Sequence, residues 1–249
     1  MGFLNPPAQS PVTFKQNFIK TAVCELRFPT LLELEVRPPH AFQARIRKIY
    51  PFYEAQVIEQ VGASDPILHE QSYIFRSKDR HWTVTVKSSS IALETAKYES
   101  FEHFFERFSQ LMDYARDLID SDFFTRVGLR YINVVPIGLP IEGWIEPALI
   151  APILSGVTGD VRSYASVIHG QLERGGYSFR HGFKSAGDGG SVNDSSSETY
   201  NLDFDYFGEN VEIQKVPDLV KYFHDMNFSF FYWCLGPKAR EALGEGKPK

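Results

Sequence analysis

The fold is decided by residues 82–118, WTVTVKSSSIALETAKYESFEHFFERFSQLMDYARDL. The first part, Trp82–Lys87 and Ile91–Thr95, is rich in β-branched residues and is interrupted by three consecutive serines, which predicts two antiparallel strands joined by a turn. The second part begins at Ser100, a good helix N-cap, and continues with apolar residues at helical spacing as far as Leu118. The stretch therefore predicts a strand pair followed by a long helix with one apolar face.

The same order of elements occurs a second time along the chain. Strands predicted at Tyr53–Val61 and Gln71–Ser77 extend the first strand pair into a meander. Later in the chain the pattern predicts three strands, at Ser163–Leu172, Tyr177–Lys184 and Tyr200–Phe207. A second aromatic-faced helix is predicted from Pro217 to about Leu235. We therefore expect an α+β fold, in which antiparallel β meanders carry two long aromatic-faced helices packed on the sheet, with a pseudo-duplicated βββα unit.

A connecting segment is expected between the two repeats. Residues 137–158 are rich in proline and glycine, with a short helix near Trp144–Leu154. We predict an N-terminal α+β half at residues 1–136 and a C-terminal α+β half at 159–249, which form either separate domains or one compact domain. The sequence also predicts a first strand at Phe18–Phe28, a short basic helix at His40–Ile49, a strand at Phe124–Val135 and an exposed Gly/Ser-rich loop at Ser185–Ser197.

Composition is that of an ordinary globular protein. Of its 249 residues, 43% are hydrophobic, 14% aromatic and 23% charged, with a formal net charge of −5. These values exclude a disordered or collagen-like chain. The acidic balance argues against nucleic acid as a partner, because phosphates must be neutralised by Lys and Arg. Many of the aromatic residues lie at core-facing positions of the two helices, so we expect an aromatic-rich core.

The cysteines and the N-terminal residues bear on the compartment. Cys24 and Cys234 lie in apolar runs and lack the spacing of zinc ligands, so we expect buried free thiols in a reducing compartment. Residues 1–11 lack the basic and apolar regions of a signal peptide. The longest apolar run is far shorter than the roughly 20 residues of a membrane span. We therefore expect a cytoplasmic protein without membrane contact.

Four signatures together resemble a known group of proteins. They are, in chain order, Phe18–Phe28, Tyr98 with the phenylalanine-rich helix after it, Arg126–Asn133, and Leu202–Asp205 followed by a helix that carries His224. In order and spacing they resemble an uncharacterised, sporadically distributed prokaryotic protein family of about this length, known only by a placeholder name. The resemblance spans most of the chain. It implies no catalytic residue, substrate or cofactor, and its patchy distribution implies a link to mobile elements or host defence.

Charged residues on two predicted strands are the main candidates for ligand binding. Because alternate residues of a strand share a face, Glu25 lies beside Arg27, and Arg126 lies beside Arg130 with a glycine between them. Two arginines so placed favour bidentate binding of a phosphate or carboxylate. Cross-strand ion pairs on a solvated face are the alternative interpretation. The candidate ligand-binding residues are Arg126, Arg130, Tyr131, Glu25 and Arg27.

Asp203 and Asp205 are weaker candidates, for a metal site. A DxD pair can hold Mg²⁺ or Mn²⁺ when a third carboxylate converges on it. The alternation of these acids with Leu202 and Phe204 is equally typical of an amphipathic strand with one exposed face. The sequence contains no GxSxG motif and no P-loop, and we expect no cofactor.

The sequence favours a non-enzymatic intracellular protein that binds a protein partner, a second copy of itself or a small anionic ligand. The reason is that no set of catalytic residues converges in the pattern, whereas two arginines share a strand face. Two other functions stay open. One is a metal-dependent hydrolase or nuclease that uses Asp203 and Asp205, and the other is a subunit that neutralises a partner toxin or effector.

Overall fold

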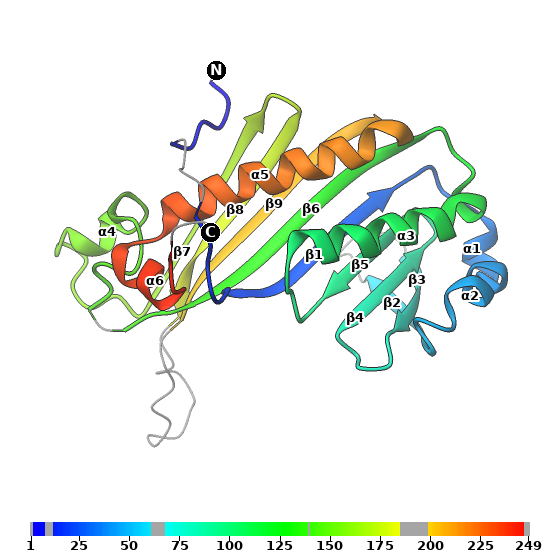
Figure 1. Cartoon of the computed structure of the whole chain (residues 1–249), viewed down its shortest axis with the longest axis horizontal. Helices are drawn as coiled ribbons and strands as arrows, with labels where there is room; N and C mark the ends of the chain where they lie inside the picture. The colour runs from blue at the N-terminus through cyan, green and yellow to red at the C-terminus, as the bar shows by residue number, and fades with distance from the viewer. Residues whose placement is uncertain (1, 8–11, 61–67, 139, 185–198, 247–249) are drawn as a thin grey trace. The chain divides into compact units, whose positions relative to one another are not determined.

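The computed structural model describes residues 2–7, 12–60, 68–138, 140–184 and 199–246 (Figure 1). The chain divides into two compact units. Unit 1 consists of Met1–Lys20, Tyr131–Tyr206 and Tyr222–Lys249, and unit 2 consists of Thr21–Arg130 and Phe207–Lys221. Each unit is thus assembled from segments that are far apart in the sequence. The domain limits expected above, 1–136 and 159–249, remain a prediction.

Nine strands form one sheet in the described part of the chain. They are β1 (Ile19–Arg27), β2 (Phe52–Gln60), β3 (Leu68–Arg76), β4 (Trp82–Lys87), β5 (Ser90–Thr95), β6 (Phe123–Pro136), β7 (Ser163–Leu172), β8 (Gly175–Lys184) and β9 (Thr199–Glu212). Their order in the sheet is β2-β3-β4-β5-β1-β6-β9-β8-β7. The meander pairs β2–β3, β3–β4, β4–β5 and β7–β8 are antiparallel, and so is β1–β5.

The helices of the described residues include two long ones. These are α3 (Phe101–Ile119) and α5 (Val216–Cys234). The shorter helical elements are α1 (Glu33–Val36), α2 (His40–Ile46), η1 (Pro147–Leu149), α4 (Ala151–Leu154), η2 (Ile213–Lys215) and α6 (Pro237–Ala242). Each described helix is too short or too polar to cross a membrane.

The strand order contains a repeated topology. In the first repeat β1 is followed by the meander β2–β5, whose last strand pairs with β1, and then by α3. In the second, β6 is followed by the meander β7–β9, whose last strand lies beside β6, and then by α5. The predicted α+β class is confirmed. The βββα pattern in the sequence omits the leading strand of each repeat, because that strand pairs with a distant segment, as Ala22 does with Thr95.

In unit 2 the apolar face of α3 packs on the meander. Ser100 Oγ accepts a hydrogen bond from the His103 amide at 3.2 Å and so caps the helix, as predicted. The ring centroids of Phe104 and Trp82, on α3 and β4, lie 5.9 Å apart. Asp120 ends the helix in a left-handed conformation, with φ 39°.

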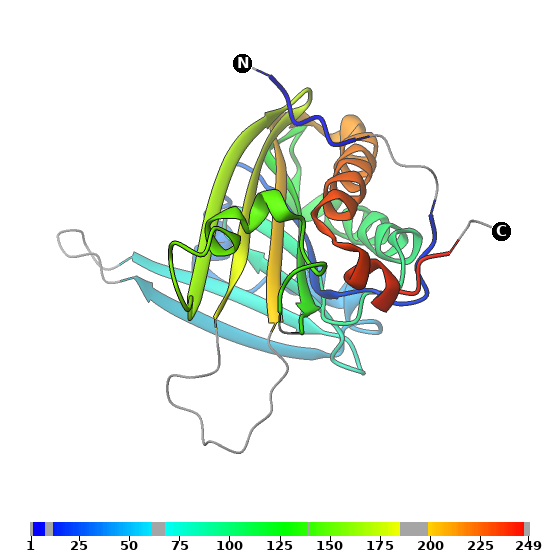
Figure 2. The same ribbon diagram turned by 90° about the vertical axis from the view of Figure 1, so that its left-hand side faces the viewer.

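In unit 1 aromatic rings from β8, β9 and α5 fill the core. The ring centroid of Phe179 lies 4.6 Å from that of Phe204 and 4.9 Å from that of Phe230. Figure 2 shows α5 along one side of these strands. Such ring contacts add to the stabilisation from burial, and the predicted aromatic-rich core is confirmed.

The cysteines agree with the sequence prediction, whereas β9 is longer than predicted. Cys24 and Cys234 are free and buried, as predicted, and burial raises the pKa of both thiols. The strand expected to end at Phe207 continues to Glu212, because backbone pairing supports a strand after its apolar alternation has stopped. The expected loop Ser185–Ser197 lies outside the described residues.

Candidate functional site

Three of the predicted ligand-binding residues meet in unit 2. Glu25 Oε1 lies 2.6 Å from Arg27 Nε and 3.5 Å from Arg126 Nη1. The guanidinium of Arg126 also lies over the ring of Phe207, 5.0 Å from its centroid. The charge of Arg126 is therefore balanced by a carboxylate of its own unit and stacked on an aromatic face.

Gly128 makes room for the Arg126 guanidinium. A Cβ atom at position 128 would overlap Nη1 of Arg126. The glycine between the two arginines was expected to let a ligand approach the strand. The space above it instead holds the side chain of Arg126, which lies along its own strand.

Tyr131 and Arg130 occupy opposite faces of β6. Tyr131 is fully buried in unit 1, and its hydroxyl lies 3.2 Å from Nδ1 of His224 on α5. Arg130 is partly exposed and shares the strand face of Arg126 by alternation. The structure thus brings Glu25, Arg27 and Arg126 together in unit 2, and it buries Tyr131 in the core of unit 1.

The two aspartates of the weaker metal hypothesis lie on β9 in unit 1. Asp203 Oδ2 is 3.8 Å from Nη1 of Arg180, and the Asp203 side chain is 13% exposed. Among the residues that the structure describes, no three His, Cys, Asp or Glu side chains are grouped so that they could hold a metal ion. The guanidinium beside Asp203 would compete with a cation for its carboxylate.

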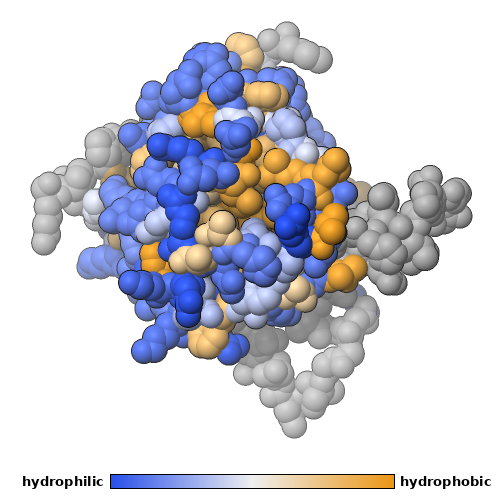
Figure 3. All heavy atoms as spheres, turned by 90° about the vertical axis from the view of Figure 1, so that its right-hand side faces the viewer, coloured by the Kyte–Doolittle hydropathy of each residue, from blue (hydrophilic) through white to orange (hydrophobic). Residues whose placement is uncertain are grey.

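A cavity of about 680 Å³ lies in unit 2 between α1, α2 and the C-terminal part of α3. We call it the α1–α2–α3 cavity, and its principal lining residues are Leu31, Leu34, Phe42, Arg45, Tyr114 and Leu118. Figure 3 views the side of the molecule that carries α1 and α2, where hydrophobic side chains gather among hydrophilic ones. The volume of the α1–α2–α3 cavity lies within the range of roughly 300–1,000 Å³ that is typical of small-molecule sites.

The walls of the cavity are anchored on β3. The consecutive prolines Pro38 and Pro39 separate α1 from α2, since proline cannot continue a helix. The hydroxyl of Tyr73 donates a hydrogen bond of 2.8 Å to the Leu34 carbonyl, which holds α1. Phe42 is buried with its ring 5.8 Å from that of Phe75, which holds α2. Both short helices are thus fixed by tertiary contacts rather than by their own length.

Arg45 is one of the charged groups on the wall of this cavity. Its Nη1 lies 2.7 Å from Asp117 Oδ2, and its Nη2 donates to the Asp113 carbonyl at 3.2 Å. The guanidinium also lies 5.9 Å from the ring centroid of Tyr114. Arg45 therefore joins α2 to α3 through contacts at the rim of an apolar space.

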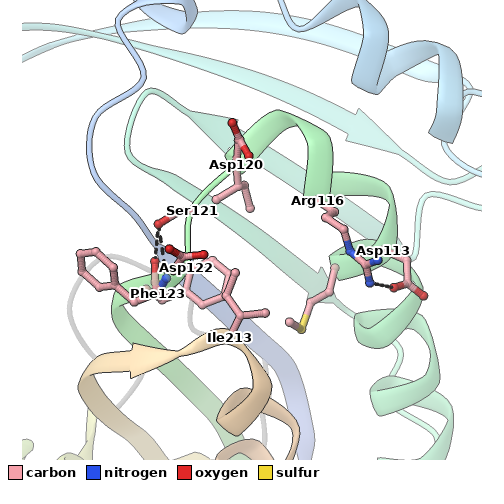
Figure 4. A pocket seen from close by; sticks show the side chains of 10 residues that line it. Asp113, Arg116, Asp120, Ser121, Asp122, Phe123 and Ile213 are labelled. Carbon is pink, nitrogen blue, oxygen red and sulfur yellow. Dashed lines mark hydrogen bonds and ion pairs between the residues drawn. The ribbon is translucent and has the colours of Figure 1, made fainter.

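A second cavity, of about 500 Å³, lies in unit 2 where α3 meets β6. Figure 4 shows Asp113 directed toward Arg116, with an N–O distance of 3.0 Å, and the carboxylates of Asp120 and Asp122 apart from one another. Ser121 Oγ donates to the Phe123 carbonyl at 2.8 Å. The polar groups here bond mainly to their own loop and helix.

Comparison with models of protein families finds no match for this chain, and comparison with curated proteins finds none either. The kind of functional site in this protein is therefore inferred from the geometry of the structure. The structure defines an α+β protein with a partly apolar cavity of ligand size. The sequence contained one signal for it, the basic helix around Arg45, but no signal for the partner Asp117 on α3.

Proposed function

We propose that this protein is a non-enzymatic binding protein, and that the α1–α2–α3 cavity is its ligand site. The observation that supports this proposal is a cavity of about 680 Å³ whose apolar wall is fixed by buried anchors and whose rim carries the Arg45 guanidinium, held by contacts to α3. Apolar lining with few placed polar groups is the usual composition of a small-molecule site.

The same proposal includes the setting of the protein. The two buried free thiols support action in the reducing cytoplasm, and the resemblance to a sporadically distributed prokaryotic family supports a link to defence or mobile elements. The protein would act there together with a protein partner or a second copy. In this proposal the cavity replaces the strand face of Arg126 as the principal ligand site, because the Arg126 side chain is only 19% exposed beside Glu25, whereas that of Arg45 is 41% exposed at the cavity rim.

The test uses N-phenyl-1-naphthylamine, a neutral apolar dye that fluoresces when it is removed from water. We expect saturable binding with one dye per chain. Ala41 lines the cavity and is exposed, so Ala41→Trp should fold normally, fill the space and weaken dye binding at least tenfold. Ala44 is exposed on the same helix outside the cavity lining, so Ala44→Trp is the matched control and should bind as the native chain does.

Two results would count against the proposed function. One is the absence of saturable dye binding to the native chain. The other is equal binding by the Ala41→Trp and Ala44→Trp variants, which would place the dye elsewhere.

A further inference from the structure

The geometry points to an amphipathic organic oxyanion as the ligand of the α1–α2–α3 cavity, an inference that rests on the proposed function. Its apolar body would lie against Leu34, Phe42 and Leu118, and its carboxylate, sulfonate or phosphate group would take the place of Asp117 on Arg45.

The apolar part of this ligand follows from the cavity wall. Leu34 and Phe42 are each 2% exposed and belong to the core, while their surfaces on the cavity side line a space that a ligand can enter. Removing an apolar ligand surface from water is favourable in proportion to the area buried. The wall therefore selects a ligand with a compact hydrocarbon or aromatic body.

The anionic part follows from the donors of Arg45. A guanidinium carries five N–H donors in a planar fork that matches an oxyanion. In the described structure Nη1 donates to Asp117 and Nη2 to the Asp113 carbonyl, which leaves donors for a second acceptor. The Asp113 carbonyl and the Tyr114 ring hold the guanidinium at the rim, so an arriving anion meets a positioned donor.

Asp117 can be exchanged for a ligand anion at low cost. Its side chain is 82% exposed and that of Arg45 is 41% exposed, so their ion pair lies in a high-dielectric environment. Ion pairs of this kind contribute little to stability. An oxyanion whose body is already held by the apolar wall would displace Asp117 into water, where that carboxylate is well solvated.

The other charged groups at the rim do not compete with this role. Glu33 Oε1 lies 3.4 Å from Arg37 Nε within α1 and its C-cap, and both side chains are about two-thirds exposed or more. These opposite charges largely cancel. His40, also exposed at the rim, adds a further hydrogen-bond donor or acceptor but no negative charge.

The test compares two dyes that share one anilinonaphthalene body. N-phenyl-1-naphthylamine is neutral, and 8-anilinonaphthalene-1-sulfonate adds one sulfonate. Affinities are measured by fluorescence titration for the native chain and for the Arg45→Gln and Asp117→Asn variants. Thermal unfolding confirms that each variant folds, and Ala41→Trp identifies the dye bound in the cavity.

We expect opposite effects of the two variants on the anionic dye. Arg45→Gln should weaken sulfonate-dye binding by about three- to tenfold, because a charge-assisted hydrogen bond at a partly exposed rim is lost. Asp117→Asn should strengthen it by about two- to fivefold, because a competing carboxylate is removed. Both variants should leave the affinity of the neutral dye within about twofold.

The possible failures are distinguishable. If the neutral dye binds in the cavity but neither variant changes the affinity of the sulfonate dye, the oxyanion inference is wrong and the binding function stands. If neither dye binds saturably, or if Ala41→Trp has no effect on either, both the binding function and this inference are wrong.

Discussion

Arg45 and Asp117 lie 72 residues apart in the chain, and the structure holds Nη1 of the first 2.7 Å from Oδ2 of the second. This pair joins α2 to α3 at the rim of the α1–α2–α3 cavity. Because both side chains are substantially exposed, the pair positions the guanidinium without burying it. In the proposed anion site, the same guanidinium would bind a ligand oxyanion in place of Asp117.

Gly128→Ala should be mildly destabilising. A Cβ atom at position 128 meets the flexible guanidinium end of Arg126, which can shift, so we expect the free energy of unfolding to fall by about 0.5–1 kcal/mol as the contacts of Arg126 with Glu25 and Phe207 are disturbed. Urea unfolding monitored by circular dichroism measures this.

Arg126→Ala provides the companion measurement. This substitution should lower the free energy of unfolding by about 1–2 kcal/mol, because the stacking on Phe207 and the contact with Glu25 are lost. Arg27→Ala removes a guanidinium that is 53% exposed and is the control, with an expected effect below about 1 kcal/mol. If Gly128→Ala is as stable as the native chain, the side chain of Arg126 does not depend on this space.

His181 should make unit 1 sensitive to acid. Burial lowers the pKa of His181 to about 4 from an ordinary value of 6.5. Between these pH values the folded state binds fewer protons than the unfolded state. The stability that neutral His181 contributes is therefore fully present above pH 6.5 and is lost as the pH falls toward 4. The full loss from this group is about 3 kcal/mol.

The measurement for His181 is the free energy of unfolding at pH 7 and at pH 4. His181→Phe should show a smaller difference between the two than the native chain, by about 3 kcal/mol. Its stability at pH 7 will also change, because the 2.7 Å contact of Nδ1 with the Tyr200 hydroxyl is lost, so only the pH dependence is diagnostic. An unchanged pH dependence would mean that His181 titrates normally.

His103 should carry its proton on Nδ1 when neutral. Its Nδ1 lies 3.2 Å from Glu99 Oε2, and its Nε2 lies 3.2 Å from Arg107 Nε, which can only donate. Nε2 must therefore accept, and the proton stays on Nδ1. Nitrogen chemical shifts of the histidine rings report the tautomer, and a proton found on Nε2 would contradict the contact with Arg107.

Phe204 should be a major contributor to the stability of unit 1. Its ring packs against those of Phe179 and Phe230, with centroid distances of 4.6 and 5.4 Å. We expect Phe204→Ala to cost about 3–5 kcal/mol in thermal or urea unfolding. Val167 is 55% exposed, so Val167→Ala should change stability by less than about 0.5 kcal/mol. Similar effects of both variants would refute the assigned core.

Local patterns predicted most of the secondary structure. The strands Trp82–Lys87 and Ser163–Leu172 begin and end at the predicted residues, because alternation and turn residues are local signals. The helix after Ser100 was equally clear, since its cap and apolar stripe lie within one continuous segment. The end of β9 was not predicted, because pairing with neighbouring strands extends it beyond its own apolar pattern.

The candidate site was much less accessible to sequence reasoning. The alternation of strand residues correctly placed Glu25 beside Arg27. The direction of the Arg126 side chain, however, depends on Phe207, which is about 80 positions away in the sequence. The cavity depends on Tyr73 holding Leu34 and on Asp117 holding Arg45, and each contact joins segments that no local pattern relates.

The sequence by itself determined the α+β class, the two long aromatic-faced helices, the buried free cysteines and most strand limits to within one residue. These properties follow from hydrophobic periodicity and from local capping and turn chemistry, which act over a few residues. Only the tertiary structure decided the strand order, the occupation of the space above Gly128 and the existence of a ligand-sized cavity. Those features arise from contacts between residues tens of positions apart, and their energies depend on side-chain geometry that exists only after the chain has folded.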